Sequence, residues 1–186
     1  LVTLKNSSEK LNALLARLGR YGAQGGETVQ PVAVAPLLHT IAERYKAQHP
    51  VTVIDAADCT VLAQPEALEQ ALVHLVQNAV EASGEAEAVL LQARREGNDA
   101  IIDVTDSGPG MTPEFVRSRL FKPFQSSKAG GFGIGAFEAR EIVRAMGGRI
   151  EVESHEGLGS RFAVRLPLAA AAELIRTMQA SRKEVA

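Results

Sequence analysis

A glycine-rich segment over residues 130–135, with the sequence GGFGIG, runs directly into a stretch with helical periodicity over 136–146. Glycines that open a helix leave backbone N–H groups accessible to phosphate oxygens, and the helix dipole adds to the attraction. The segment lacks the Gly-x-Gly-x-x-Gly and Gly-Lys-Ser/Thr spacings that follow a strand in Rossmann and P-loop proteins, so it excludes those two patterns. It therefore predicts a phosphate-binding helix in a different arrangement of helices and strands.

Helix and strand patterns are mixed along most of the chain. A helix begins at Pro65, a residue that suits the first helical position, and the apolar residues of this helix fall on one face. The turn residues Gly97-Asn98 join two strands into a hairpin. The expected strands cover 29–34, 51–54, 88–95 and 100–105, with two more after residue 148, and the expected helices cover 36–48, 65–79 and 136–146, with a helical turn near residue 113.

The composition fits about one domain that buries a real core. The chain has 186 residues, 46% of them hydrophobic, and its formal net charge is -2. No overall basic field marks a nucleic-acid or membrane-surface binder. The single cysteine, Cys59, excludes an intramolecular disulfide and a cysteine-based metal cluster. No apolar run reaches the roughly 18 residues of a membrane span, and we expect a cytoplasmic location.

The two ends of the chain differ from its middle. A short seam near the start has heptad spacing, which fits either a helix packed on its own domain or a coiled-coil stalk. The seam consists of Leu4, Leu11, Leu14 and Leu18. Residues 21–26 predict a linker, and the alanine-rich segment 169–186 predicts a helix. Because the chain opens with Leu1 and has no signal segment, we expect it to be a piece of a longer protein.

Asn78 lies four residues after His74, on the flank of the apolar face of the helix that begins at Pro65. A carboxamide in this position can offer its oxygen to a hard cation. A satisfied surface amide fits the same pattern, so the position alone does not choose between the two roles.

Asp106 directly follows an expected strand and begins the motif DSGPG. A carboxylate at a strand end can accept a hydrogen bond from the amino group of a ligand. Gly108 and Gly110 let the backbone approach a flat ring closely. An ordinary turn has the same Asp-x-Gly chemistry, so the motif alone leaves both interpretations open.

Five motifs occur in one order over about residues 36–167. They are NAVEAS from Asn78, DSGPG from Asp106, FKPFQSSK from Phe121, GFGIG from Gly131 and GLGSRF from Gly157. Together they resemble the N, glycine-rich and F boxes of the catalytic ATP-binding domain of sensor histidine kinases. The run GIGAFEAR from Gly133 further resembles the kinases associated with exosortase and PEP-CTERM sorting systems.

The resemblance implies the α+β fold shared by gyrase, Hsp90, histidine kinase and MutL ATPases. This fold is a two-layer α/β sandwich in which helices cover one face of a mixed sheet. The resemblance also implies a division of the chain. Residues 1–22 would end the second dimerisation and phosphotransfer helix as an N-terminal stalk, 23–27 would be a linker, 28–168 the catalytic ATP-binding domain and 169–186 a helical tail.

The family's motif positions assign the first roles to residues that would contact the adenine base and the metal ion. Asn78 would coordinate Mg²⁺, and Asp106 would bind the adenine amino group of ATP. Gly108 and Gly110 would make room for the base. His74 departs from the family pattern, because kinases often have a second Asn there and hydrolysing relatives a Glu that activates water. Imidazole puts a second amide contact in doubt and argues against an efficient ATPase, and a structural role for His74 is the alternative.

The remaining family roles concern a flexible lid over the nucleotide. Its phosphate-contacting end would consist of Gly131, Gly133, Ile134 and Gly135. Lys128 would reach the terminal phosphates as a catalytic residue beside Asn78, with a solvated lid lysine as the alternative. Phe121 and Phe124 would anchor the lid on the core.

The chain contains no acceptor motif, which is a His followed by Glu or Asp within a long helix. Only His155 precedes an acidic residue, and it lies in an expected strand-loop region. The resemblance therefore implies transfer of the ATP γ-phosphate to a histidine on an upstream helix, for relay to a response regulator receiver domain, in a homodimer formed through the stalk. The alternatives are a gyrase-like ATP hydrolase and a nucleotide-binding regulatory module without phosphotransfer.

Overall fold

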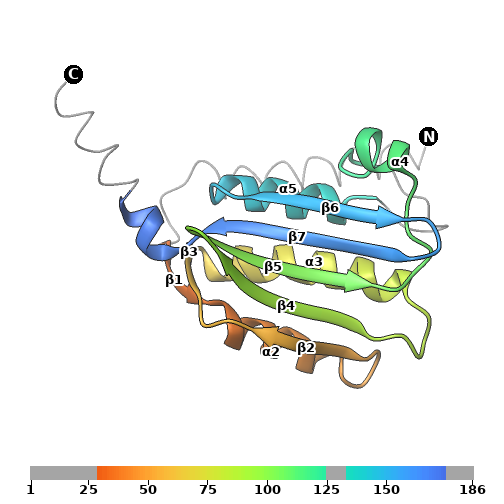
Figure 1. Ribbon diagram of the computed structural model, residues 1–186, viewed down its shortest axis with the longest axis horizontal. Coiled ribbons are helices and arrows are strands. Elements are labelled where there is room, and N and C mark those ends of the chain that lie inside the picture. Colours follow the sequence, from red (N-terminus) through yellow and green to blue (C-terminus); the bar gives the residue numbers. More distant parts are fainter. Residues whose placement is uncertain (1–28, 125–132, 175–186) are drawn as a thin grey trace, which may run out of the picture.

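The computed structural model describes residues 29–124 and 133–174, which are built around a five-stranded sheet in the order β2-β4-β5-β7-β6 (Figure 1). Its strands are β2 (Val51–Ala56), β4 (Val89–Glu96), β5 (Asp99–Asp106), β6 (Arg149–His155) and β7 (Gly159–Pro167). The sheet is mixed, because β2 pairs parallel with β4 and the other neighbours pair antiparallel. The helices are α2 (Val34–Tyr45), α3 (Pro65–Ala82), α4 (Pro113–Ser118) and α5 (Gly135–Ala145).

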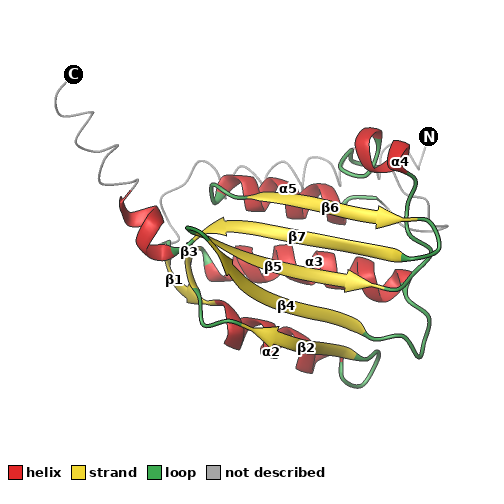
Figure 2. Cartoon of the chain, in the orientation of Figure 1, coloured by secondary structure: helices red, strands yellow, loops and turns green. Residues whose placement is uncertain are grey.

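The helices α2, α3 and α5 lie on one face of the sheet (Figure 2). On β5 the side chains of Ile102 and Val104 face this layer and alternate with residues of the opposite face, because strand side chains have a period of two. The fully buried side chains of α3 include Leu68, Leu72 and Leu75. The prediction of a two-layer sandwich is confirmed, and it follows from burying one apolar face of each element against the other.

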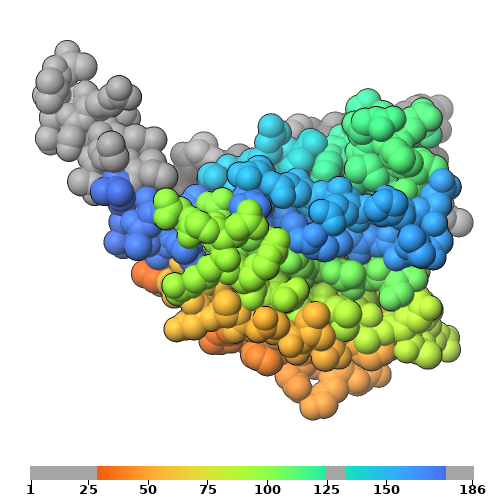
Figure 3. All heavy atoms as spheres, in the orientation of Figure 1, coloured from red at the N-terminus to blue at the C-terminus, as the bar shows by residue number. Residues whose placement is uncertain are grey.

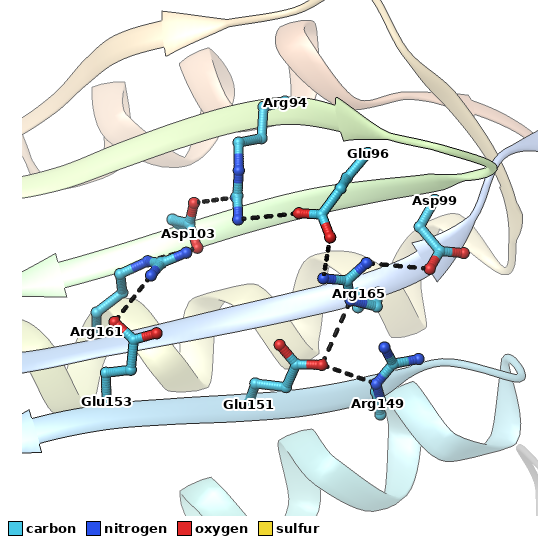
Figure 4. A network of polar contacts seen from close by, with 9 residues as sticks. All are labelled: Arg94, Glu96, Asp99, Asp103, Arg149, Glu151, Glu153, Arg161 and Arg165. Carbon is cyan, nitrogen blue, oxygen red and sulfur yellow. Dashed lines mark hydrogen bonds and ion pairs between the residues drawn. The ribbon is translucent and has the colours of Figure 1, made fainter.

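Charged residues occupy the opposite face of the sheet (Figure 4). Asp103 accepts hydrogen bonds from Arg94 Nη1 at 2.6 Å and from Arg161 Nε at 3.0 Å. Arg165 donates to Glu96 at 2.9 Å, and this bond lowers the pKa of the Glu96 carboxyl. The rest of the network consists of Asp99, Arg149, Glu151 and Glu153. Figure 3 shows these strands forming the molecular surface, and the paired charges explain why none of the described helices covers this face.

Most predicted elements are confirmed within a few residues. The helix expected from Pro65 begins there, and the hairpin turns at Gly97, which has a φ of 60°. The sequence patterns missed β3 (Thr60–Ala63), which pairs with β1 (Gln30–Ala33) in a separate two-stranded sheet. Next to β3, burial raises the pKa of the Cys59 thiol, so this residue is an unreactive part of the core.

The ends of the chain are described only in part. The expected stalk helix (1–22) and linker (23–27) lie outside the described residues. Residues 169–174 are helical, as predicted for the start of the tail, and residues 175–186 also lie outside the description. Among the helices that are described, none is both long enough and apolar enough to cross a membrane.

Candidate functional site

Asp106 is the last residue of β5 and is only 5% exposed. Its position, two residues after Val104, places its side chain on the helix-covered face of the sheet. The carboxylate Oδ1 accepts a hydrogen bond of 2.9 Å from the Gly108 N–H group. This bond closes the turn that follows β5 and fixes the direction of the carboxylate. A carboxylate that accepts a hydrogen bond from the amino group of a ligand needs such a fixed direction.

Gly108 and Gly110 lie so close to neighbouring backbone that only glycine fits at either position. A Cβ atom on Gly108 would lie 2.5 Å from the carbonyl oxygen of Ala82, the last residue of α3. On Gly110, which has a φ of 67°, it would lie 1.9 Å from the carbonyl oxygen of His155 at the end of β6. Any side chain at either position would therefore displace backbone. Their role in making room for a base stays a prediction.

A pair of serines beside Asp106 was missed in the sequence. Ser160 is buried and pairs with Asp106 in the register of β5 and β7, and its Oγ lies 2.9 Å from Ser154 Oγ on β6. Ser154 donates to the Gly159 carbonyl and accepts from the Met111 N–H group at 2.8 Å. Because Ser154 has a single hydroxyl hydrogen, Ser160 is the donor in the serine pair. These hydroxyls could have been identified only from the register of the strands, which the sequence patterns did not give.

The N-terminus of α5 packs directly against α3. A Cβ atom on Gly135, the first residue of α5, would lie 3.5 Å from Asn78 Oδ1 and 3.6 Å from His74 Nδ1. The preceding Ile134 makes no side-chain cap, and Gly133 has a φ of 63°, which glycine adopts readily. The structure thus brings together Asn78, His74 and the helix start that the glycine-rich segment predicted.

A buried carboxylate lies beside this helix start and was also missed in the sequence. Glu138 of α5 is 3% exposed and accepts a hydrogen bond of 2.9 Å from Gln70 Nε2. Its other oxygen lies 3.0 Å from His74 Nε2. A signal was present, because Glu138 falls four residues before Ile142 on the apolar face of this helix.

The base end and the phosphate end lie along one helix. Gly108 contacts Ala82 at the end of α3, and Asn78 lies four residues earlier, which is about one helical turn. The Asp106 turn, Asn78 and the start of α5 therefore form one continuous candidate site beside α3.

The residues around Asn78 fit a nucleotide-bound cation better than a metal held by protein alone. Within residues 29–124 and 133–174, no group of three or more His, Cys, Asp or Glu side chains is placed to hold a metal ion. Mg²⁺ in nucleotide sites commonly takes one or two protein ligands and completes its shell with phosphate and water oxygens. An amide oxygen from Asn78 fits that donor set.

The segment before residue 125 is attached to α5 through Phe121. The Phe121 carbonyl accepts a hydrogen bond of 3.1 Å from Arg140 Nη2, and the guanidinium lies 4.8 Å from the centre of the Phe121 ring. Phe121 is partly buried against the core, as predicted, but Phe124 is 40% exposed, so its predicted packing on the core is wrong. The predicted lid residues Lys128 and Gly131 lie outside the described residues.

The sequence matches a family described as "Histidine kinase-, DNA gyrase B-, and HSP90-like ATPase" over residues 63–170. The C4-dicarboxylate transport sensor protein DctB of Rhizobium meliloti (strain 1021) is 35% identical over 167 residues, which cover 86% of this chain and 27% of DctB. The sensor histidine kinase ZraS of Salmonella typhi is 38% identical over 111 residues, which cover 59% of this chain and 24% of ZraS. The chain spans about a quarter of the length of these curated relatives.

Solved structures share the fold. Full-length ShkA in complex with AMPPNP superposes with a TM-score of 0.71 and 28% identity, over 90% of this chain and 38% of ShkA. The nucleotide-free catalytic domain of histidine kinase ThkA superposes with a TM-score of 0.68 and 25% identity, over 76% of this chain and 96% of that domain. The sheet and the helix layer are thus similar to those of solved kinase domains.

Proposed function

Since this chain belongs to the family of histidine kinase-, DNA gyrase B- and HSP90-like ATPases, as the ATP-binding catalytic domain of a sensor histidine kinase, we propose that it holds Mg²⁺-ATP. It would then transfer the γ-phosphate to a histidine on a separate helix of the full-length kinase. The single observation that carries this proposal is the arrangement along α3. A buried carboxylate suited to a base, at the end of β5, and a helix N-terminus suited to phosphates, that of α5, both lie beside α3. The turn after Asp106 meets α3 at Ala82, and Gly135 meets it one turn earlier at Asn78.

At the base end, Asp106 would accept a hydrogen bond from the adenine amino group. At the phosphate end, the first N–H groups of α5 would bind phosphate oxygens, and Asn78 would bind the cation, which neutralises the charge that builds up on the phosphates. Lys128 would add a positive charge near the terminal phosphate. The protein's contribution is then positioning and electrostatic stabilisation, as in other phosphoryl transfers.

The chain's own histidines are poor acceptors. Within the described residues, His39 is an exposed residue of α2 and precedes Thr40, while His49 is buried and precedes Pro50. His74 is paired with Glu138, and His155 ends a strand. The attacking imidazole nitrogen must therefore come from elsewhere: it would bond to the γ-phosphorus as the bond to the β-γ bridging oxygen breaks, releasing ADP.

The proposal extends to the whole protein. Residues 1–22 would end a dimerisation helix joined by 23–27 to a nucleotide-binding domain at 28–168, with a tail at 169–186. The phosphohistidine would pass its phosphoryl group to a response regulator receiver domain. Dimerisation through the stalk and a cytoplasmic position, where ATP is available, would complete the arrangement.

Calorimetry and phosphotransfer test the proposal together. The isolated chain should bind Mg²⁺-ATP and incorporate no label from γ-labelled ATP. Full-length kinase carrying Asp106→Asn should bind ATP poorly, yet become labelled in an acid-labile form when it dimerises with a wild-type partner. Acid-labile phosphate on the isolated chain alone would contradict the absence of an acceptor, and stoichiometric phosphate release without any acceptor would favour the hydrolase alternative.

A further inference from the structure

The two ends of the described chain lie beside each other at one edge of the domain. Val61 of β3 pairs with Val32 of β1 on one side and forms a bridge with Leu168 on the other. The chain therefore enters through β1 and leaves after β7 on the two sides of one short strand (Figure 1). Two strand spacings separate Val32 from Leu168, which is about 10 Å. This is also about the distance between the axes of two packed helices.

The tail begins at this edge and is fixed at its start. The Leu168 N–H group donates a hydrogen bond of 2.8 Å to the carbonyl oxygen of Asn98 in the turn between β4 and β5. The Leu168 carbonyl oxygen accepts a bond of 2.9 Å from the Ala172 N–H group, which closes the first turn of the helix. These two bonds set the direction in which the tail leaves the domain.

The side of the tail that faces away from the domain is apolar. Ala172 is partly buried, whereas Ala170 and Leu174 are exposed, Leu174 by 63%. Residues four apart share one face of a helix, and Met178 continues this spacing in the sequence. Val29, the first described residue before β1, is also exposed, by 45%. A stripe with helical spacing, unlike a single exposed leucine, indicates a contact surface.

We propose that the tail packs this outward face on the end of the stalk helix of the same chain, with Leu174 against Leu15. The inference rests on the proposed function, because it takes residues 1–22 as the end of a stalk helix. It adds an interaction surface to the chain that nucleotide binding does not use.

The length of chain before β1 favours the stalk as the occupant of this face. Residues 23–29 can span at most about 25 Å, so the end of the stalk must lie within that distance of Gln30. A helical tail over 169–186 is about 27 Å long and starts on the other side of β3. The end of the stalk and the tail are therefore held within reach of each other at the same edge of the domain.

The stalk has an apolar residue that its heptad seam does not use. Leu15 directly follows Leu14 of the seam and lies three residues before Leu18, so in a helix it falls on the flank of the seam. When the seam is buried between two stalks, Leu15 is left for a further helix, and Leu174 is the large side chain that the tail offers to it. The contact would join the nucleotide domain to the stalk at a second place besides the linker. It would thereby restrict how the domain approaches the acceptor histidine.

Disulfide formation in the full-length kinase tests the contact. Leu15→Cys combined with Leu174→Cys should convert most of the protein to a disulfide within one chain under mild oxidation, because bridged Cα atoms must lie within about 7 Å of each other. The matched control combines Leu15→Cys with Leu158→Cys and should stay reduced. Leu158 is also an exposed leucine, but it lies in the turn at the opposite end of β7 from the tail. Mass spectrometry of the digested protein identifies the linked peptides.

Amide exchange of residues 169–174 gives a second measurement that needs no disulfide. Leu15→Ala removes the proposed contact and should speed this exchange about tenfold. Leu158→Ala makes the same change at the exposed leucine of the β6–β7 turn and should leave the exchange of the tail unchanged. Calorimetry should give the same ATP affinity for Leu15→Ala as for the original protein, because neither Leu15 nor the tail belongs to the nucleotide site.

The outcomes distinguish this inference from the proposed function. A disulfide between two chains, which doubles the mass on a denaturing gel, would overturn the contact within one chain. If Leu174→Cys alone links two copies, the tail of a second copy is the occupant instead, which also overturns it. Equal yields from the Leu174 and Leu158 pairs would show random collision and have the same consequence. Failure of the original protein to bind ATP, with the internal disulfide still formed in the Leu15 and Leu174 pair, would contradict the proposed function and support the contact.

Discussion

The two ends of the candidate nucleotide site are built differently. At the base end, Gly108 and Gly110 lie so close to the backbone carbonyls of Ala82 and His155 that a Cβ atom has no room. At the phosphate end, a Cβ atom on Gly135 would meet its nearest neighbours, side-chain atoms of Asn78 and His74, at 3.5 Å or more. The base end of the candidate site is thus closed by backbone packing, whereas Gly135 has room for a methyl group. We therefore expect substitutions of the tightly packed glycines to lower the unfolding free energy, and substitutions of Asp106 and Asn78 to lower ATP affinity.

The largest expected effect is on folding, from Gly110→Ala. The new Cβ atom would lie 1.9 Å from the His155 carbonyl oxygen, at a φ of 67° that disfavours side chains. We expect a loss of more than about 3 kcal/mol of unfolding free energy, measured by urea denaturation. Gly97→Ala is the matched control, because Gly97 has a φ of 60° with no atom within 4 Å of the new Cβ. It should cost only about 1–2 kcal/mol, and equal losses in both variants would contradict the close backbone contact.

A smaller effect, confined to binding, is expected from Asp106→Asn. The amide oxygen can still accept the Gly108 N–H bond, while the amide NH₂ group cannot accept a hydrogen bond from the adenine amino group. ATP affinity should fall by roughly 1.5–3 kcal/mol with little loss of stability. GTP, whose base has the carbonyl oxygen O6 in place of the adenine amino group, can accept from the new NH₂ group and should lose less affinity or gain some. Unchanged ATP affinity in a folded variant would remove Asp106 from the site.

At the phosphate end, Asn78→Ala should act through the metal. Loss of one oxygen ligand should weaken Mg²⁺-ATP binding about tenfold, which corresponds to about 1.4 kcal/mol. Binding of ATP in the presence of a chelator should change much less. Calorimetric titrations with and without Mg²⁺ compare the two, and equal losses would make Asn78 a packing residue.

The smallest expected effect on stability comes from Gly135→Ala. The new methyl group makes ordinary van der Waals contacts, and alanine favours a helix over glycine, so the unfolding free energy should stay within about 1 kcal/mol of the original value. Urea denaturation of Gly135→Ala and Gly110→Ala under the same conditions compares their unfolding free energies directly. A loss as large as that of Gly110→Ala would show that the phosphate end is locked by packing as firmly as the base end.

Local sequence patterns predicted most of the elements and the main site residues. The apolar face of α3 and the Gly97-Asn98 turn each depend on a few neighbouring residues, so periodicity and turn chemistry are sufficient. Asp106 and Asn78 were recognised because they begin motifs of several residues. The limits were also local: β3 has only four residues, too few for a clear period, and whether Phe124 is buried depends on contacts outside its own motif.

The tertiary structure alone decided which residues meet across the chain. Gln70 and Glu138 are 68 residues apart, and no periodicity within either helix indicates that α3 and α5 bring them together. The serine pair beside Asp106 depends on the register of three strands in the same way. Spacing therefore predicted the mixed strands and helices and a helix opened by glycines, and the resemblance to the kinase family predicted a sheet with one helix layer. The packing of that layer decided that His74 has a buried carboxylate partner and that Gly110 has no space for a side chain, because both depend on distances between elements remote in sequence.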